Sequence, residues 1–235
     1  MKETLIKALC DLNIDFSEEQ IEKFEIYASL LTEWNEKINL TAITDSREIA
    51  VKHFADCASC LKYTALSGSV IDVGTGAGFP GMVLKILRPE IELTLLDSLN
   101  KRILFLEDVT EKLSLTGIKT VHMRAEDGGR DKKLRENFDF SVSRAVANLS
   151  TLSEYCLPFV KTGGEFISMK GPDISEELCA AQNAIKTLGG EVSGIKNISL
   201  LNGEINHTII SIKKVRQTPS VYPRKAGKPS KEPLK

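Results

Sequence analysis

Seven short runs of apolar and β-branched residues occur along this chain, each with the length and composition of a β-strand. They lie at residues 70–73, 91–96, 120–123, 138–142, 165–169, 191–195 and 208–212. Segments with the three- and four-residue apolar spacing of helices lie between them, as at 101–113 and 175–188, and a turn is expected at 161–164. Because strand and helix alternate, the pattern predicts an α/β fold with a doubly wound, mostly parallel, seven-stranded sheet.

The first 66 residues show helical spacing instead. Residues 17–20 form a capping box, and the apolar positions that follow recur every three or four residues as far as Trp34. A second helix is expected over residues 45–61. We therefore divide the chain into an N-terminal helical cap (1–66), an α/β domain (67–215) and a C-terminal tail (216–235).

The stretch VIDVGTGAGFPG (70–81) joins the first predicted strand to a helix through four glycines, Gly74, Gly76, Gly78 and Gly81. Glycines let such a loop turn sharply and approach a ligand closely, and the helix that follows directs free N–H groups toward it. A nucleotide-like ligand is therefore expected. Three of these glycines also satisfy a dinucleotide fingerprint, which alone is weak evidence.

Two acids beside this loop favour S-adenosylmethionine. Asp72 lies in the strand just before the glycines, where a carboxylate would repel a pyrophosphate but suits the cationic amino-acid end of S-adenosylmethionine. Asp97 ends the second strand, about 20 residues beyond the loop, as expected for a carboxylate that binds ribose hydroxyls. Asp97 fits either cofactor, so Asp72 decides between them.

Three more strand ends carry polar residues, and ligands of open α/β sheets bind at the carboxyl ends of the strands. Glu126 follows the third strand and is well placed to accept a hydrogen bond from an adenine amino group. Arg144 follows the fourth strand and Lys170 the fifth. Both are therefore site candidates.

Charge is distributed unevenly. The chain has a net charge of −1, but residues 213–235 hold eight basic residues and one acid, so this end carries +7 and the rest −8. The prolines there disfavour helix and predict an extended arm that could follow a phosphate backbone. Arg224, Lys225 and Lys228 are the predicted RNA contacts. The alternative is a solvated tail that only aids solubility.

Five cysteines without a secretory leader indicate reduced thiols. Cys57 and Cys60 resemble half of a zinc site, but no second pair accompanies them, so no metal is expected. No apolar run approaches 18 residues. We therefore expect a soluble, cytoplasmic protein with no membrane association, and a monomer.

Seven stretches carry a family resemblance: WNEKINLTAI (34–43), KHFADC (52–57), VIDVGTGAGFPG (70–81), RAEDG (124–128), SRAVANLSTL (143–152), MKG (169–171) and YPRKAGKP (222–229). Together they are similar to the bacterial small-subunit ribosomal RNA guanine-N7 methyltransferase G family, also called glucose-inhibited division protein B. The match spans almost the whole chain. Cys57 departs from it, because relatives usually carry serine there.

The resemblance implies a Rossmann-like, class I methyltransferase that uses S-adenosylmethionine to methylate N7 of a guanine in 16S ribosomal RNA. The RNA partner is then 16S ribosomal RNA, the small ribosomal subunit or an assembly intermediate. Carried over by position, the cofactor contacts are Gly74, Phe79, Ala125, Glu126 and Arg144, beside Asp72, Gly76, Gly78 and Asp97 from the argument above.

Guanine N7 carries an in-plane lone pair and loses no proton, so positioning and electrostatics suffice for methyl transfer. No general base is expected, and no residue is assigned a catalytic role. Arg144 and Lys170 are candidates for positioning the guanine or a phosphate at the rim.

Two other functions stay open on the sequence. An NAD(P)-dependent oxidoreductase is suggested by the dinucleotide fingerprint, although Asp72 and the lack of a second substrate domain count against it. A non-catalytic, RNA-binding ribosome-assembly protein would keep the loop only as structure, and the intact acids Asp72, Asp97 and Glu126 count against that.

Overall fold

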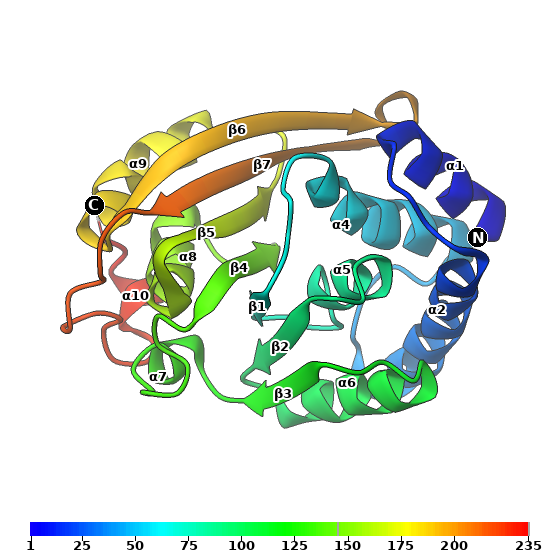
Figure 1. Cartoon of the computed structure of the whole chain (residues 1–235), viewed down its shortest axis with the longest axis horizontal. Helices are drawn as coiled ribbons and strands as arrows, with labels where there is room; N and C mark the ends of the chain where they lie inside the picture. Colours follow the sequence, from blue (N-terminus) through cyan, green and yellow to red (C-terminus); the bar gives the residue numbers. More distant parts are fainter. Residues whose placement is uncertain (145, 235) are drawn as a thin grey trace.

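A computed structural model describes residues 1–144 and 146–234 of the chain, without the side chain of Asn202. Its centre is a seven-stranded sheet with the order β3-β2-β1-β4-β5-β7-β6 (Figure 1). The first five strands are parallel, and β7 is antiparallel to both of its neighbours. The strands are β1 (Ser69–Val73), β2 (Glu92–Asp97), β3 (Ile118–His122), β4 (Phe138–Arg144), β5 (Val160–Lys170), β6 (Gly190–Leu200) and β7 (Ile205–Lys214). The predicted sheet is confirmed.

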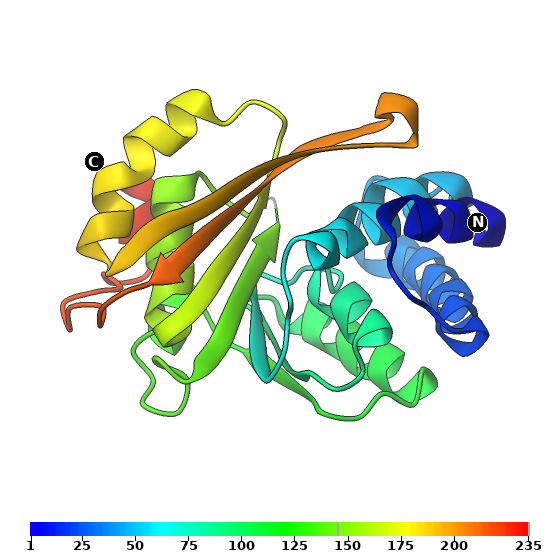
Figure 2. The same cartoon turned by 45° about the horizontal axis from the view of Figure 1, so that its top comes forward.

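Helices cover both faces of this sheet (Figure 2). One apolar cluster joins the N-terminal helices to α5 (Gly81–Leu87) and α6 (Asn100–Lys112). The other joins α8 (Leu149–Cys156) and α9 (Ser175–Thr187). Strand β1 serves both clusters, because successive side chains of a strand point to opposite faces: Val70 packs in the first cluster and Ile71 in the second.

The N-terminal cap contains α1 (Lys2–Leu12) and α2 (Glu18–Ile38), and the predicted capping box at Ser17 is confirmed. The prediction of a single helix over 45–61 is wrong in detail. The segment consists of α3 (Ser46–Glu48), the π-helix η1 (Ile49–Ala55), α4 (Asp56–Ala58) and the 3-10 turn η2 (Ser59–Lys62). A π-helix has a wider turn than an α-helix, which apolar spacing does not reveal.

The turn expected at 161–164 is also wrong, because these residues stay within β5. The register between β4 and β5 shifts there: Phe138 pairs with Val160, but Phe140 pairs with Glu165. The extra residues of β5 therefore form a bulge. The glycines at 163 and 164 suit a bulge as well as a turn, so the sequence pattern could not separate the two.

The β6–β7 hairpin extends to the N-terminal cap (Figure 1). Near its tip, Arg47 donates to Glu204 at 2.8 Å. Further along β7, His207 Nδ1 lies 2.5 Å from an oxygen of Asp56, which belongs to α4. The β6–β7 hairpin thus contacts α3 and α4 of the N-terminal cap.

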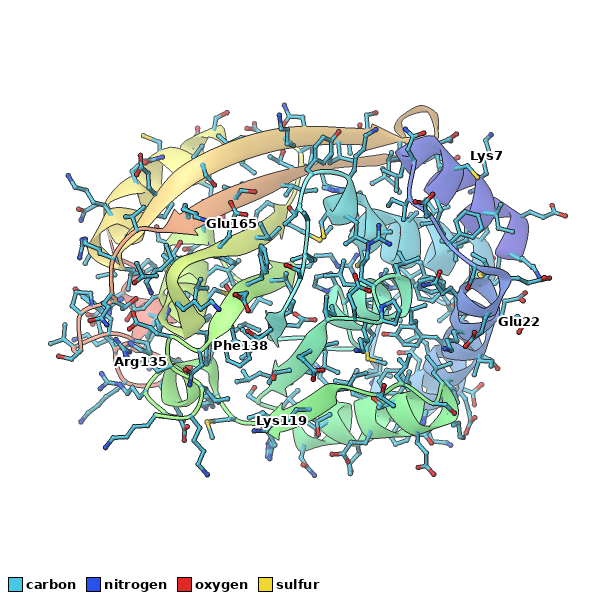
Figure 3. All side chains as sticks on the ribbon, viewed as in Figure 1. Lys7, Glu22, Lys119, Arg135, Phe138 and Glu165 are labelled. Atoms are coloured by element: carbon cyan, nitrogen blue, oxygen red, sulfur yellow. The ribbon has the colours of Figure 1, made fainter. Side chains whose placement is uncertain are left out.

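The C-terminal tail folds back onto the domain, so the expected extended arm is wrong for residues up to 234. Arg135, labelled in Figure 3, donates to the carbonyls of Tyr222 and Thr218 at 2.8 and 2.6 Å. The tail then forms the short helix α10 (Lys228–Lys231). Guanidinium donors on the domain bind the tail's carbonyls, an attachment that its proline content does not predict. Lys235 lies outside the described residues.

The remaining short elements are α7 (Ala125–Gly128) and the 3-10 turns η3 (Leu157–Phe159) and η4 (Leu201–Gly203). Within residues 1–144 and 146–234, no helix combines the length and apolar character needed to span a bilayer.

Candidate active site

A cleft of about 730 Å³ opens at the carboxyl ends of β1, β2, β4 and β5. The strand order reverses between β1 and β4, and such a switch point is where open α/β sheets bind ligands. The cleft gathers residues from far apart in the sequence: the cap, the glycine loop, four strand ends and the tail. Its volume falls in the usual range for small-molecule sites.

The glycine loop forms one wall of the cleft. Gly74 and Gly76 have φ values of 72° and 60°, a region in which only glycine is relaxed, and both line the cleft. A Cβ on Gly76 would meet nothing nearer than the Gly74 carbonyl at 4.0 Å. The backbone at Gly76 is therefore open to the cleft, as a close ligand approach requires.

Gly78 has a different structural role. A Cβ there would lie 2.5 Å from Tyr27 Oη and 2.6 Å from Met82 Cγ, and the residue does not line the cleft. Tyr27, from α2, is buried and donates its hydroxyl to the Ala77 carbonyl. Gly78 therefore allows the cap to pack against the loop.

Asp72 lies beneath the loop and is fully buried rather than part of the cleft wall. Its Oδ2 accepts from Thr75 Oγ1 at 2.7 Å and from the Gly81 backbone at 2.8 Å, so it braces both ends of the loop. Its Oδ1 has no hydrogen-bond partner among the described residues. Burial raises the pKa of Asp72 to about 7.

Asp97 lines the cleft at the end of β2 and is 2% exposed. Its Oδ2 accepts from the Gly76 backbone at 2.9 Å and from Arg102 at 3.2 Å, while Oδ1 accepts from the Leu99 backbone at 2.9 Å. These bonds fix the carboxylate and join it to the loop. Its place beside Gly76 suits the ribose role expected for it.

Ala125 and Glu126 begin α7 and line the same end of the cleft as Asp97. Glu126 is 4% exposed, and its Oε1 accepts from the backbone N–H of Gly227 at 2.8 Å. A carboxylate offers about four acceptor positions, so this bond leaves others for a ligand. Two acids thus meet where the sequence predicted a nucleoside.

Phe79, His53 and Arg144 form a stack on the other side of the loop. The rings of His53 and Phe79 are stacked with centroids 4.4 Å apart, and the Arg144 guanidinium lies 5.0 Å from the Phe79 centroid. Arg144 donates to Asp56 Oδ2 at 2.7 Å and to the Lys52 carbonyl at 2.9 Å. Arg144, a predicted site residue, is therefore held rigidly at the cleft wall.

The hydrogen bonds of His53 define its tautomer. Arg144 Nη2 lies 3.0 Å from His53 Nδ1, and a guanidinium can only donate, so Nδ1 accepts and the proton resides on Nε2. Burial, followed by the charge of Arg144, lowers the pKa of His53 to about 4. The imidazole is consequently neutral near pH 7.

Nε2 of His53 donates to Thr41 Oγ1 at 2.9 Å. Thr41 Oγ1 also accepts from the Ile43 backbone at 3.0 Å. Both of its acceptor positions are then used, and its own hydroxyl hydrogen remains to be donated. Thr41 lines the cleft, so this relay presents a hydrogen-bond donor there.

Asp56 joins three elements by its two oxygens. Arg144 binds one oxygen, and His207 from β7 lies 2.5 Å from the other. Burial acts to raise the pKa of Asp56, but the bond from His207 and the charge of Arg144 hold it below its ordinary value. Asp56 therefore balances the charge of Arg144.

Lys170, the second predicted positioning residue, ends β5 and lines the cleft. Its ammonium donates to the Ala147 carbonyl at 2.7 Å and pairs with Glu177 at 2.6 Å. Its side chain is only 10% exposed. These partners hold the charge at the rim.

The predicted RNA contacts of the tail lie in two environments. Lys225 and Lys228 are exposed. Arg224 instead binds the buried Glu154 through Nε and Nη2, at 2.7 to 3.1 Å. Its charge is neutralised within the domain, so the two lysines carry the prediction of RNA contact.

Five of the further cleft residues, which sequence reasoning did not assign to the site, are Thr41, His53, Asp56, His207 and Gly227. Four of them lie in stretches of the family resemblance, which was the available signal. His207 lies in no such stretch, and only the antiparallel pairing of β7 brings it to the site. No local pattern could have indicated it.

The site residues fit an adenine nucleoside. An open glycine backbone at Gly76, a fixed carboxylate at Asp97 and a second one at Glu126 offer the close approach and acceptors that a ribose and an adenine amino group require. His53 is the described histidine beside the loop, and it does not suit a general base, because it is neutral and both of its nitrogens are in hydrogen bonds.

The family model and the relatives that match this chain carry the same description. The family model described as rRNA small subunit methyltransferase G matches residues 20–206. A protein of that name from Alkaliphilus oremlandii is 55% identical over 237 residues, covering 100% of this chain and 99% of the relative. One from Clostridium perfringens strain 13 is 53% identical over 234 residues, covering 98% of each.

Solved structures resemble the fold at low sequence identity. The precorrin-6y C5,15-methyltransferase of Geobacter metallireducens has a TM-score of 0.51 at 18% identity, covering 67% of this chain and 86% of that one. A mutant of the 16S rRNA (adenine(1408)-N(1))-methyltransferase of Catenulisporales acidiphilia has a TM-score of 0.53 at 14% identity. The match covers 64% of this chain and 86% of that one. At such identities the likeness concerns the fold alone.

Proposed function

This chain belongs to the rRNA small subunit methyltransferase G family, and we propose that its cleft carries out that family's reaction, methyl transfer from S-adenosylmethionine to N7 of a guanine in 16S ribosomal RNA. The observation that carries the proposal is the meeting of Gly76, Asp97 and Glu126 at one end of the cleft with Arg144 at the other. The family match spans the strands and loops that supply all four.

In this proposal the two acids bind the nucleoside. Asp97 accepts from the ribose hydroxyls, and Glu126 with Ala125 receives the adenine edge. Gly74 and Gly76 allow the backbone to approach the ligand, while Phe79 and Arg144 form the wall toward the sulfonium. Asp72 acts through the loop, since it contacts Thr75 and Gly81 rather than the cleft. When bound, S-adenosylmethionine supplies an activated methyl group on its sulfonium.

The residues around the transfer site suit a substrate atom that needs no deprotonation. N7 of guanine has a lone pair in the ring plane, so the protein must position it and tolerate a positive charge. His53 is neutral, and Asp56 offsets the charge of Arg144. The site therefore adds no net positive charge beside the methyl group and needs no general base.

The hydroxyl of Thr41 serves as a positioning donor for the guanine. Its hydrogen is the one left free by the relay from Arg144 through His53. Guanine presents O6 beside N7, and O6 is an acceptor. Thr41→Val should raise KM for the RNA and leave the affinity for S-adenosylhomocysteine unchanged, and Thr41→Ser should restore KM. A loss of S-adenosylhomocysteine affinity in Thr41→Val would assign the hydroxyl to the cofactor instead.

The RNA substrate is ribosomal RNA, and we propose that it is presented in the small ribosomal subunit or an assembly intermediate. Exposed Lys225 and Lys228 stand on the tail on either side of Gly227, which lines the cleft. Lys170 at the rim is paired with Glu177, so the tail lysines are the charges that favour a phosphate beside the entering base.

Isothermal titration calorimetry with S-adenosylmethionine and, separately, NAD tests the cofactor choice. The proposal expects binding of S-adenosylmethionine with one site per chain and no heat from NAD. Binding of NAD alone would favour an oxidoreductase. Binding of neither would favour a non-catalytic RNA-binding role.

A further inference from the structure

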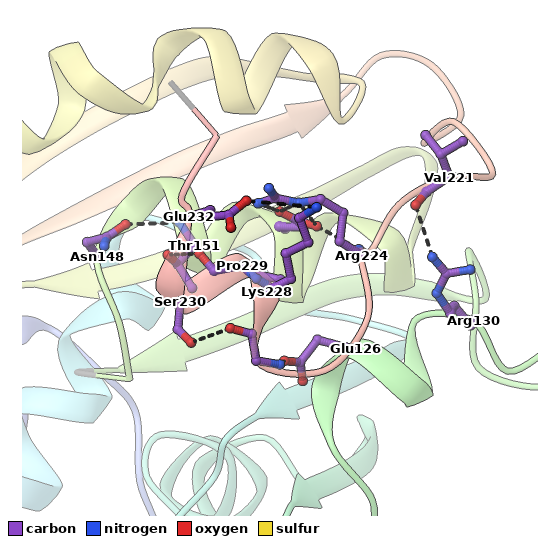
Figure 4. A network of polar contacts seen from close by, with 12 residues as sticks. Glu126, Arg130, Asn148, Thr151, Val221, Arg224, Lys228, Pro229, Ser230 and Glu232 are labelled. Atoms are coloured by element: carbon purple, nitrogen blue, oxygen red, sulfur yellow. Dashed lines mark hydrogen bonds and ion pairs between the residues drawn. The ribbon is translucent and has the colours of Figure 1, made fainter.

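The C-terminal tail contributes directly to the nucleoside end of the cleft. Gly227 and Ser230 are among the lining residues, and the backbone N–H of Gly227 donates to Glu126 Oε1 at 2.8 Å. Figure 4 shows Ser230 and Glu126 on neighbouring parts of this network. About a hundred residues separate Gly227 from Glu126, so only the folded-back tail brings them together.

Two contacts to α8 hold this part of the tail, one before and one after Gly227, and Figure 4 labels Arg224, Pro229 and Thr151, which take part in them. Before it, Arg224 binds the carboxylate of Glu154 through its side chain, and its backbone N–H donates to the same residue at 2.7 Å. After it, the Pro229 carbonyl accepts from Thr151 Oγ1 at 3.0 Å. Glu154 is fully buried, so its charge requires the Arg224 partner.

Gly227 is suited to the point where the tail turns over the cleft. Its φ is 81°, and a Cβ built on it would meet no atom within 4 Å. A larger residue would thus be strained by its backbone conformation rather than by a collision. Its carbonyl accepts from Ser230 Oγ at 3.1 Å, which closes the turn.

Exposed residues and cleft-lining residues are neighbours along this part of the tail. Lys225, Ala226 and Lys228 are exposed on its outer side, while Gly227 and Ser230 border the cleft. Nothing else among the described residues bonds to Glu126 from that side. The orientation of the Glu126 carboxylate therefore depends on whether the tail is docked.

We propose that residues 224–230 form the adenine-side wall of the cofactor site, with Gly227 orienting Glu126 to accept the exocyclic amine of an adenine nucleoside. The proposal rests on the proposed function. Because Gly227 and the nucleoside share one carboxylate, docking of the tail strengthens nucleoside binding, and bound nucleoside stabilises the docked tail by the same factor.

Calorimetry with S-adenosylhomocysteine tests whether docking of the tail strengthens nucleoside binding. Gly227→Val forces a β-branched residue into positive φ and displaces the tail. Gly163→Val is the matched control, because Gly163 has a φ of 90°, likewise no atom within 4 Å of its Cβ, and lies in the β5 bulge, outside both residues 224–230 and the cleft lining. We expect Gly227→Val to weaken S-adenosylhomocysteine binding at least tenfold and Gly163→Val to leave it unchanged.

Limited trypsin digestion of the unmodified chain tests whether bound nucleoside stabilises the docked tail. Trypsin can cut after Lys225 in the tail and after Lys132 in an exposed turn. Saturating S-adenosylhomocysteine should slow the cut after Lys225 several-fold and leave the cut after Lys132 unchanged, and NAD should protect neither.

The outcomes separate this inference from the proposed function. If the unmodified chain does not bind S-adenosylhomocysteine, the proposed function fails. If it binds, while Gly227→Val binds equally well and the cut after Lys225 is not slowed, the tail is not part of the cofactor site.

Discussion

The backbone N–H of Gly76 donates to Asp97 Oδ2 at 2.9 Å, so the glycine loop and the second strand are joined at the place where the ribose is expected. Removing the Asp97 side chain would therefore loosen the loop as well as the ligand. Asparagine keeps an oxygen for Gly76 but loses the charge. We expect Asp97→Asn to weaken S-adenosylmethionine binding about tenfold, the effect of losing a charge-assisted hydrogen bond worth about 1.5 kcal/mol.

Calorimetric titration measures this loss. Asp108→Asn is the control, because Asp108 accepts from Trp34 Nε1 at 2.8 Å and lies outside the cleft. Equal affinity in Asp97→Asn and the unmodified chain would remove Asp97 from the site.

Gly76 and Gly78 differ in what surrounds them, and substitution should separate their roles. Gly76→Val points a branched side chain into the cleft, so we expect cofactor binding to be lost while the fold is kept. Gly78→Val collides with Tyr27 and Met82, so it should destabilise the fold by about 1–3 kcal/mol. Circular dichroism melting and calorimetry on both variants give the two quantities. Normal binding by folded Gly76→Val would place the cofactor elsewhere.

Asp72 makes the stability of the protein depend on pH. Its pKa rises from 3.8 in the unfolded chain to about 7 on burial, so between these values the folded state binds more protons and stability falls as pH rises. Asparagine does not titrate. The free energy of unfolding of Asp72→Asn, relative to that of the unmodified chain, should therefore rise from pH 4 to pH 7 by at most about 4 kcal/mol and then stay constant.

Urea unfolding at pH 5, 6, 7 and 8 measures this difference, in which titrations shared by both proteins cancel. A constant difference across this range would mean that Asp72 is ionised throughout. S-adenosylmethionine affinity should change little, because Asp72 lies outside the cleft wall.

Exposed tail lysines test the RNA surface. Arg224 must be kept, because it neutralises the buried Glu154. Replacing Lys225, Lys228 and Lys231 with alanine should weaken RNA binding and flatten the slope of log affinity against log salt by about 0.7 for each lost single-strand contact. Lys37, Lys112 and Lys119, which are exposed on α2, α6 and β3, provide a matched triple control. Slopes that change equally in both triples would leave the tail without a specific RNA role.

Much of the sheet was predictable because its signals are local. Apolar runs marked seven strands, and the glycines between β1 and α5 marked the turn where the strand order reverses. The apolar periodicity of the sequence did not predict the structure correctly where the backbone departs from regular helix or strand geometry. The π-helix that carries His53 and the bulge at 161–164 each insert residues without changing which residue types occur.

The sequence allowed residues at strand ends to be placed at one cleft, whereas it did not indicate the residues that tertiary contacts bring there. Asp97, Arg144 and Lys170 end parallel strands and Glu126 follows one, and all four line the cleft. Asp72 also sits at a strand end, but strand alternation turns it beneath the loop. Gly227 reaches the site because the tail folds back, and the Arg224–Glu154 pair, which joins two residues 70 positions apart, is one of the contacts that hold it there.

Methyl transfer to purified, unmethylated small ribosomal subunits tests the central claim most directly. Labelled S-adenosylmethionine supplies the methyl group, and borohydride reduction followed by aniline cleavage locates 7-methylguanosine in the 16S ribosomal RNA. The account predicts incorporation at N7 of a guanine, lost in the Gly76→Val variant. Incorporation at any other base or atom, or none with an enzyme that binds S-adenosylmethionine, would contradict it.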